Sequence, residues 1–205
     1  MILERTGTYG TYYGSPYNSS AALNSSQMEV NARYIADALM DQGWSLNSIS
    51  AMLGNMQVES SINPGRWQSD IVEPADPTGV GYGLVQWTPY TNYTNWAISN
   101  GYSDPSVMDG NLARINYELA NNLQWIPTLQ YPMTFSEFKT STRSPYILAL
   151  TFLANYERPA DPNQPIRGVY ATNWYNYLRG HGFGTRKSKF KWVLYAKKIR
   201  ERNNI

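Results

Sequence analysis

One stretch of this chain is apolar around almost the full turn of a helix. It runs from Tyr146 to Leu153 and follows Ser144 and Pro145, which suit the N-cap and the first position of a helix. A helix that is apolar on nearly every side has no face suited to water, so it must be buried on nearly every side. The pattern therefore predicts a helix in the interior of a compact domain, closed by Pro159.

Further segments repeat their apolar residues three and four positions apart, which is the period of a helix with one buried face. They cover residues 27–42, which end at Gly43; 46–60, with Ser45 as N-cap; 112–123, which precede Pro127; and 166–178. In the last of them, Ile166, Val169 and Trp174 share one flank. We expect a helix in each segment.

Between these helices, residues 61–90 break into turns, with Asn63-Pro64-Gly65 and Gly81-Tyr82-Gly83 among them. Short strands fit at Ile71 to Glu73 and at Gly83 to Trp87. The expected fold class is α+β, mainly α, with a small β or turn-rich lobe.

The 205 residues suit one compact domain with terminal extensions. Residues 1–26 lack a helical or alternating period and are interpreted as an extended N-terminal arm, residues 27–180 as the domain, and residues 181–205 as a basic amphipathic tail. The first ten residues carry neither a basic nor an apolar signal region, and no uninterrupted apolar run is long enough to cross a membrane. We expect no Sec signal and no membrane span.

The chain has no cysteine and a single histidine, His181. Cysteine nucleophiles, cysteine-rich zinc sites and multi-histidine metal centres are therefore excluded, and we expect neither a metal nor a cofactor. A Ser-His-Asp arrangement would have to use His181, which lies between two glycines. The chemistry must come mainly from carboxylates and hydroxyls.

Glu59 is the carboxylate whose position stands out. It lies near the C-terminus of the helix predicted over 46–60, at the margin of the stripe formed by Leu46, Ile49, Leu53 and Met56. Partial burial disfavours the charged form of a carboxyl and raises its pKa, and the negative end of a helix dipole acts in the same direction. A glutamate in such a place can act as a general acid, although a solvated helix end is the commoner reading of position alone.

Three segments together resemble the phage tail lysozyme family of the lysozyme and lytic transglycosylase superfamily. They are Gly54-Asn55-Met56-Gln57-Val58-Glu59-Ser60-Ser61-Ile62-Asn63-Pro64, Gly81-Tyr82-Gly83-Leu84-Val85-Gln86-Trp87-Thr88 and Phe152-Leu153-Ala154-Asn155-Tyr156-Glu157-Arg158-Pro159. The resemblance covers about residues 27–178. It implies a lysozyme-like fold, with Glu59 as the catalytic acid.

The resemblance also implies the residues that contact the sugar. Gln86, Asn155 and Tyr156 match substrate-contacting positions of the family pattern, while Trp87 and Tyr82 are expected to stack on sugar faces. Packing in the core of a small lobe is the alternative for these aromatic residues.

Cleavage of a glycosidic bond ordinarily needs a second group, which stabilises the transition state or activates water. Asp70, Glu73 and Asp76 lie in the loop that follows the first motif, and the residues do not select one of them. If none serves, a transglycosylase route through a hydroxyl of the sugar becomes the better expectation. Hydrolysis and transglycosylation both stay open.

The resemblance implies a peptidoglycan glycosidase carried in the virion at the tip of a phage tail. Its partners would be the bacterial cell wall and other tail proteins, the latter held through the arm and the tail. A lysis enzyme released inside the host, and a non-catalytic tail protein that keeps the lysozyme fold, are the alternatives.

The segment from Arg186 to Arg202 carries eight basic side chains against Glu201 alone, a net charge of +7 in a chain of net charge +2. Its apolar residues predict an amphipathic helix. Anionic wall polymers or membrane, a larger assembly and nucleic acid would all attract such a segment.

Overall fold

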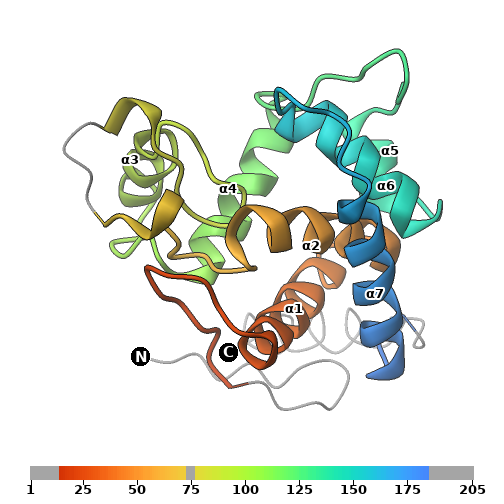
Figure 1. Cartoon of the computed structure of the whole chain (residues 1–205), viewed down its shortest axis with the longest axis horizontal. Helices are drawn as coiled ribbons and strands as arrows, with labels where there is room; N and C mark the ends of the chain where they lie inside the picture. Colours follow the sequence, from red (N-terminus) through yellow and green to blue (C-terminus); the bar gives the residue numbers. More distant parts are fainter. Residues whose placement is uncertain (1–13, 73–76, 185–205) are drawn as a thin grey trace, which may run out of the picture.

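The computed structural model of the chain describes residues 14–72 and 77–184, which form a mainly helical domain (Figure 1). The α-helices are α1 (Ser25–Met40), α2 (Leu46–Ser60), α3 (Thr91–Ser99), α4 (Met108–Ala120), α5 (Phe135–Thr140), α6 (Pro145–Phe152) and α7 (Ile166–Gly180). Two short 3₁₀ turns, η1 (Gln68–Asp70) and η2 (Pro77–Gly79), lie in the turn-rich region, and a π-helical turn, η3 (Leu153–Glu157), continues α6.

Helix α2 lies at the centre and packs against α1, α6 and α7. Its predicted stripe is confirmed, because Leu46, Ile49, Leu53 and Met56 are all buried. Burial extends beyond that stripe to small and polar residues such as Ser50 and Asn55, since α6 and α7 cover further faces of the helix.

Polar side chains mark where the helices begin. The Oγ of Ser45 accepts from the amide of Ser48 at 3.1 Å, and the Oγ of Ser144 accepts from the amide of Ile147 at 3.3 Å, so both predicted caps are confirmed. Helix α1 begins two residues earlier than predicted, because Asn24 forms a capping box with Gln27.

The turn-rich lobe contains α3, shown with its flanking turns at the left of Figure 1. Within the described residues its β pairing is limited to two isolated bridges, which join Tyr82 to Trp67 and to Trp87. The predicted strand from Gly83 to Trp87 is wrong: Gly83 and Gln86 have φ of 82° and 50°, so the segment curls into a turn. Ile71 and Val72 are exposed and form no strand, while Glu73 lies outside the described residues.

Two helices differ from their sequence patterns. Helix α4 ends at Ala120, so Leu123 lies beyond it and is exposed. Helix α7 turns Gly168 and Ala171 inward, whereas Ile166 and Val169 are exposed. The reason is close packing: Ala171 lies against Gly54 of α2, and a Cβ atom at Gly168 would meet the ring of Tyr146 on α6.

The described part of the N-terminal arm, residues 14–24, is non-helical and lies against the body. The side-chain amide of Asn31 accepts from the backbone N–H of Tyr17 at 2.7 Å and donates to its carbonyl at 2.8 Å. Asn63 makes the corresponding pair of bonds with Ser19. Residues 1–13 of the predicted arm and residues 185–205 of the predicted tail lie outside the described residues.

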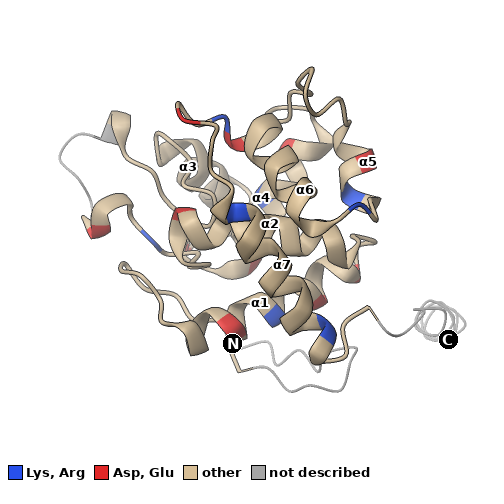
Figure 2. Cartoon of the chain, turned by 45° about the vertical axis from the view of Figure 1, so that its right-hand side comes forward, with Lys and Arg blue, Asp and Glu red and all other residues tan. Residues whose placement is uncertain are grey.

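Charged residues are few and dispersed over the described ribbon (Figure 2). None of the described helices combines the length and the apolar character that crossing a membrane requires.

Candidate active site

Glu59 is the penultimate residue of α2, and its side chain is 22% exposed. The helix ends there because Ser61 and Ile62 both adopt left-handed backbone conformations. The hydroxyl of Ser60 donates to the carbonyl of Leu84 at 2.9 Å and so joins the helix end to the turn-rich lobe. The predicted position of Glu59, at a helix end and on the edge of the core, is the one that the structure has.

A buried cation that was not predicted from the sequence contacts this carboxylate. The Nη2 atom of Arg167, on α7, lies 2.6 Å from Oε1 of Glu59, and the arginine side chain is only 4% exposed. Its other two nitrogens also donate hydrogen bonds: Nε donates to Oε1 of Gln164 at 2.7 Å, and Nη1 donates to Oδ1 of Asn55 at 3.2 Å. Arg167 is therefore a fixed counterion for Glu59.

Glu59 lies on the wall of a cavity of about 540 Å³. The cavity is formed where the end of α2 meets the turns of the lobe and the segment after η3; its lining residues are Glu59, Arg66, Gln68, Ser69, Val85, Gln86, Thr88, Glu157 and Pro159. All but two of these side chains are polar or charged. Such a site suits a ligand rich in hydroxyl and amide groups.

Gln86 is the predicted substrate-contacting residue that reaches this cavity. Its Nε2 donates to the backbone carbonyls of Gly83 and Arg66, at 2.9 and 3.2 Å. The side chain thus holds its own turn in place while it forms part of the wall.

A second carboxyl in the cavity belongs to Glu157, the last residue of η3. Its Oε1 atom is buried and has no hydrogen-bond partner within the described part of the chain. Burial, and next the negative charge of Glu59, raise the pKa of the Glu157 carboxyl well above its usual range, against the smaller opposing effect of Arg167. Glu157 was not predicted as a site residue, although it lies inside the third matched segment.

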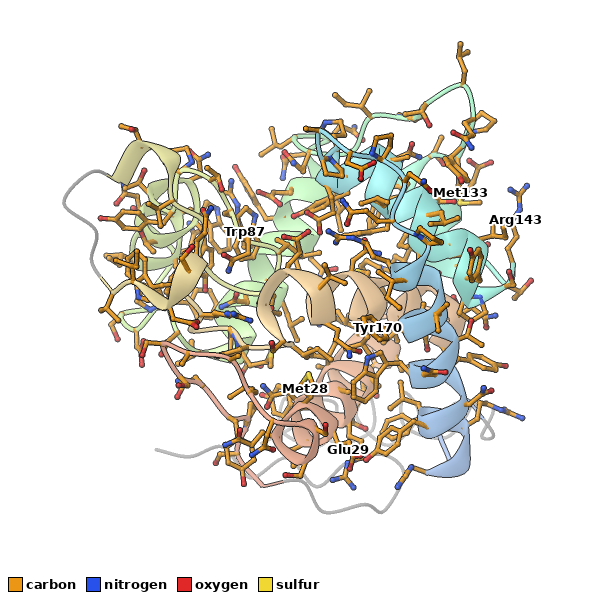
Figure 3. The ribbon with its side chains drawn as sticks, in the orientation of Figure 1. Met28, Glu29, Trp87, Met133, Arg143 and Tyr170 are labelled. Atoms are coloured by element: carbon orange, nitrogen blue, oxygen red, sulfur yellow. The ribbon has the colours of Figure 1, made fainter. Side chains whose placement is uncertain are left out.

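The other predicted sugar-contacting residues lie in the interior. Tyr156 and Trp87 are buried, and both donate to the carboxylate of Glu118 on α4, with Trp87 Nε1 lying 3.0 and 3.1 Å from its two oxygens. Figure 3 shows Trp87 between the turn-rich lobe and α4. Arg114 completes the cluster with an ion pair to Glu118 at 2.8 Å.

Tyr82 and Asn155 are also buried. Tyr82 is packed edge-on against Trp67, with ring centroids 4.8 Å apart. The Oδ1 of Asn155 accepts from the amide and the hydroxyl of Thr128, both at 3.0 Å. These four predicted sugar-contacting residues therefore pack in the interior and do not line the cavity: Trp87, Tyr156, Tyr82 and Asn155.

The structure does not bring the loop carboxylates that were predicted as second catalytic groups into the described lining of the cavity. Asp70 is exposed, forms an ion pair with Arg66 at 3.2 Å and is not among the residues that line the cavity. Glu73 and Asp76 lie outside the described residues.

The chain is similar to one known protein family and to a phage protein. A family described as phage tail lysozyme matches residues 30–178. Over 166 residues the chain is 51% identical to the protein named Morphogenesis protein 1 of Bacillus phage B103, and the aligned part makes up 81% of this chain and 44% of that protein. The chain thus spans less than half the length of this relative. The matched range includes Glu59, Gln86, Glu157 and Arg167.

Proposed function

Because the chain belongs to the phage tail lysozyme family, we propose that it cleaves the glycan strands of bacterial peptidoglycan, with Glu59 as the carboxyl that delivers a proton to the glycosidic oxygen. The observation that carries the proposal is the placement of Glu59 at the end of α2, on the wall of a polar cavity and within the matched range.

The cavity supplies what glycosidic cleavage requires. The leaving oxygen needs a proton as the bond to the anomeric carbon breaks, and the positive charge that develops on the sugar needs a nearby carboxylate or an attacking water. Glu59 and Glu157 contribute two carboxyls to the lining of the cavity, and Gln86 contributes an amide oxygen. The polar lining suits the hydroxyl and acetamido groups of a glycan.

The proposed setting is the phage particle. The relative from Bacillus phage B103 is named a morphogenesis protein, and the family is named for the phage tail. We place the chain in the virion, at the tail tip, where it would open the cell wall for delivery of DNA. The competing function is a non-catalytic role in assembly of the particle, which the name of this relative, a morphogenesis protein, supports.

The decisive experiment compares the wild-type chain with Glu59→Gln and Glu29→Gln on purified peptidoglycan. The Glu59→Gln change keeps the shape of the side chain but leaves no proton to donate, so release of soluble glycan should fall by at least about 100-fold. Glu29 lies on α1 and is not among the residues that line the cavity, so its variant controls for the change of charge. A folded Glu59→Gln chain with full activity would remove Glu59 from the mechanism, and an inactive wild type would favour the assembly role.

The products distinguish hydrolysis from transglycosylation. If water attacks the anomeric carbon, the fragments carry reducing ends, whereas attack by a hydroxyl of the same sugar gives 1,6-anhydro ends that are lighter by one water. We expect reducing ends, because Glu157 offers a second carboxyl that can take a proton from water. Mass spectra that contain only anhydro ends would contradict this expectation.

A further inference from the structure

Glu157 combines three properties that an ordinary structural glutamate does not share. It lines the cavity that holds Glu59, its Oε1 atom is buried, and that atom has no hydrogen-bond partner within the described residues. A buried carboxylate oxygen without a donor is costly, whereas a protonated carboxyl in the same place costs much less. The geometry therefore favours a neutral Glu157.

The charged groups around Glu157 come from three helices and from the residue that follows it. Glu59 on α2 and Glu118 on α4 repel a negative charge there, while Arg167 on α7 and the adjacent Arg158 attract it. The cations are already committed: Arg167 pairs with Glu59 at 2.6 Å, and Arg158 donates to the carbonyl of Asn155 at 3.0 Å. Glu118 is in turn compensated by Arg114.

Glu59 has the opposite surroundings. Its carboxylate forms an ion pair with a fixed guanidinium and is partly open to solvent. The two carboxyls that line the cavity thus have different surroundings: Oε1 of Glu157 is buried without a hydrogen-bond partner within the described residues, whereas Glu59 is paired with a cation.

We propose that Glu157 is the second catalytic carboxyl of this site, and that Glu59 and Glu157 together carry one proton in the free protein. The inference rests on the proposed glycan cleavage. It assigns to Glu157 the part that the sequence had left open among Asp70, Glu73 and Asp76.

The proton balance of the reaction follows from this arrangement. The shared proton moves to the glycosidic oxygen through Glu59, while the bond to the anomeric carbon breaks and its electron pair goes to that oxygen. Water then adds to the anomeric carbon and returns one proton to the pair, now doubly ionised. The site ends each cycle with the same single proton, and no other reactant is needed.

The test is the pH profile of kcat/KM on soluble glycan for wild type, Glu157→Gln and the Glu29→Gln control. Wild-type activity should fall on the alkaline side as the shared proton is lost. Glu157→Gln removes the carboxyl whose pKa is raised, so this alkaline limb should move to lower pH and activity at pH 7 should fall by about tenfold or more. A uniform loss at every pH would indicate a purely structural role and overturn the inference.

A second measurement follows the carboxyls directly and needs no substrate. In wild-type chain labelled with ¹³C at the glutamate carboxyls, one signal should titrate well above the usual range and disappear in Glu157→Gln. Absence of such a signal overturns the shared proton. If wild type cleaves glycan and Glu157→Gln keeps the wild-type profile, this inference fails while the proposed function stands. A wild type that cleaves no glycan overturns the proposed function and, with it, the catalytic role of Glu157.

Discussion

At the scale of single residues, the charge distribution in the site depends on how deeply each charged side chain is buried and on which groups it contacts. Arg167 is almost fully buried, yet all three of its nitrogens have partners, on Glu59, Gln164 and Asn55. Arginine suits this place because its planar fork can serve several acceptors at once. The ion pair also holds the end of α2 against α7, so the same contact contributes to the fold and to the charge of the cavity.

The Arg167–Glu59 pair can be tested through stability. Arg167→Met should lower the free energy of unfolding by about 3 kcal/mol, because it leaves buried acceptors and a partly buried carboxylate without their donor. Arg167→Lys should cost less, since it keeps the charge. Chemical denaturation of Arg167→Met, Glu59→Gln and the double variant completes a cycle, and we expect the two single losses not to add. Additive losses would show that the pair contributes nothing.

Glu157 should link stability to pH. Its pKa is raised in the folded protein by burial and then by Glu59, so the unfolded chain loses this proton first as the pH rises above about 4.3. The carboxyl therefore costs stability increasingly from that pH up to its folded pKa, and the full cost remains above it. Glu157→Gln removes the cost, and its advantage over wild type in unfolding free energy should grow with pH across this window, by about 1.4 kcal/mol for each pKa unit of the shift. An advantage that does not change with pH would contradict the raised pKa.

At the scale of elements, the contact between α2 and α7 sets the position of both Glu59 and Arg167. A Cβ atom built on Gly54 would lie 2.4 Å from the carbonyl oxygen of Arg167 and 2.7 Å from the amide nitrogen of Ala171. Both are backbone atoms of α7, which cannot rotate away as a side chain can. The glycine is therefore required by the closeness of the two helices.

Gly54→Ala should separate these helices. Alanine favours a helix by about 1 kcal/mol over glycine, but the clash with α7 should outweigh this gain and lower the free energy of unfolding by about 2 kcal/mol. Activity should fall as well, because Arg167 moves with α7. Gly180→Ala is the matched control, since no atom of the described residues beyond its own turn of α7 lies within 4 Å of its Cβ position and the substitution should be neutral or slightly stabilising. Equal melting temperatures for the two variants would contradict the close packing.

The π-helical turn η3 has a comparable role on the other side of the cavity. It directs Asn155 and Tyr156 into the interior, where they bond Thr128 and Glu118, and leaves Glu157 at the cavity wall. Such turns inside or after α-helices are frequent at functional sites. Glu118 thereby connects η3 with the turn that carries Gln86, through Tyr156 and Trp87.

At the scale of the whole molecule, the described body is joined to a segment of very different charge. Residues 186–202 carry a net charge of +7, whereas the whole chain carries +2. The first 185 residues are thus mildly acidic.

Deleting residues 186–205 tests whether this charge serves attachment. We expect lower activity on intact walls and unchanged activity on short soluble glycan, with the loss shrinking as added salt screens the attraction to anionic polymer. If the segment docks into a particle, the deletion should instead block incorporation while activity on both substrates persists. Equal loss on both substrates would make the segment part of the catalytic fold.

Local patterns in the sequence were sufficient for five of the seven α-helices in the described residues and for the position of one candidate catalytic residue, whereas α3 and α5 were not predicted. The caps Ser45 and Ser144, the buried stripe of α2 and the position of Glu59 at its end all depend on neighbours within about one turn, so the sequence alone determines them. The segment around Gln86 is different, because its sequence predicted a strand and the structure has a tight turn there.

Only the tertiary structure decided what surrounds Glu59. Arg167 and Glu157 are remote from it in sequence, and their approach depends on how α7 and η3 pack around α2. The same holds for Trp87 and Tyr156, because an aromatic ring with a polar tip suits a sugar-binding surface and a core equally well until its partner is known. That partner, Glu118, comes from a third part of the chain, and no spacing within a motif encodes a contact between elements that meet only when the domain folds.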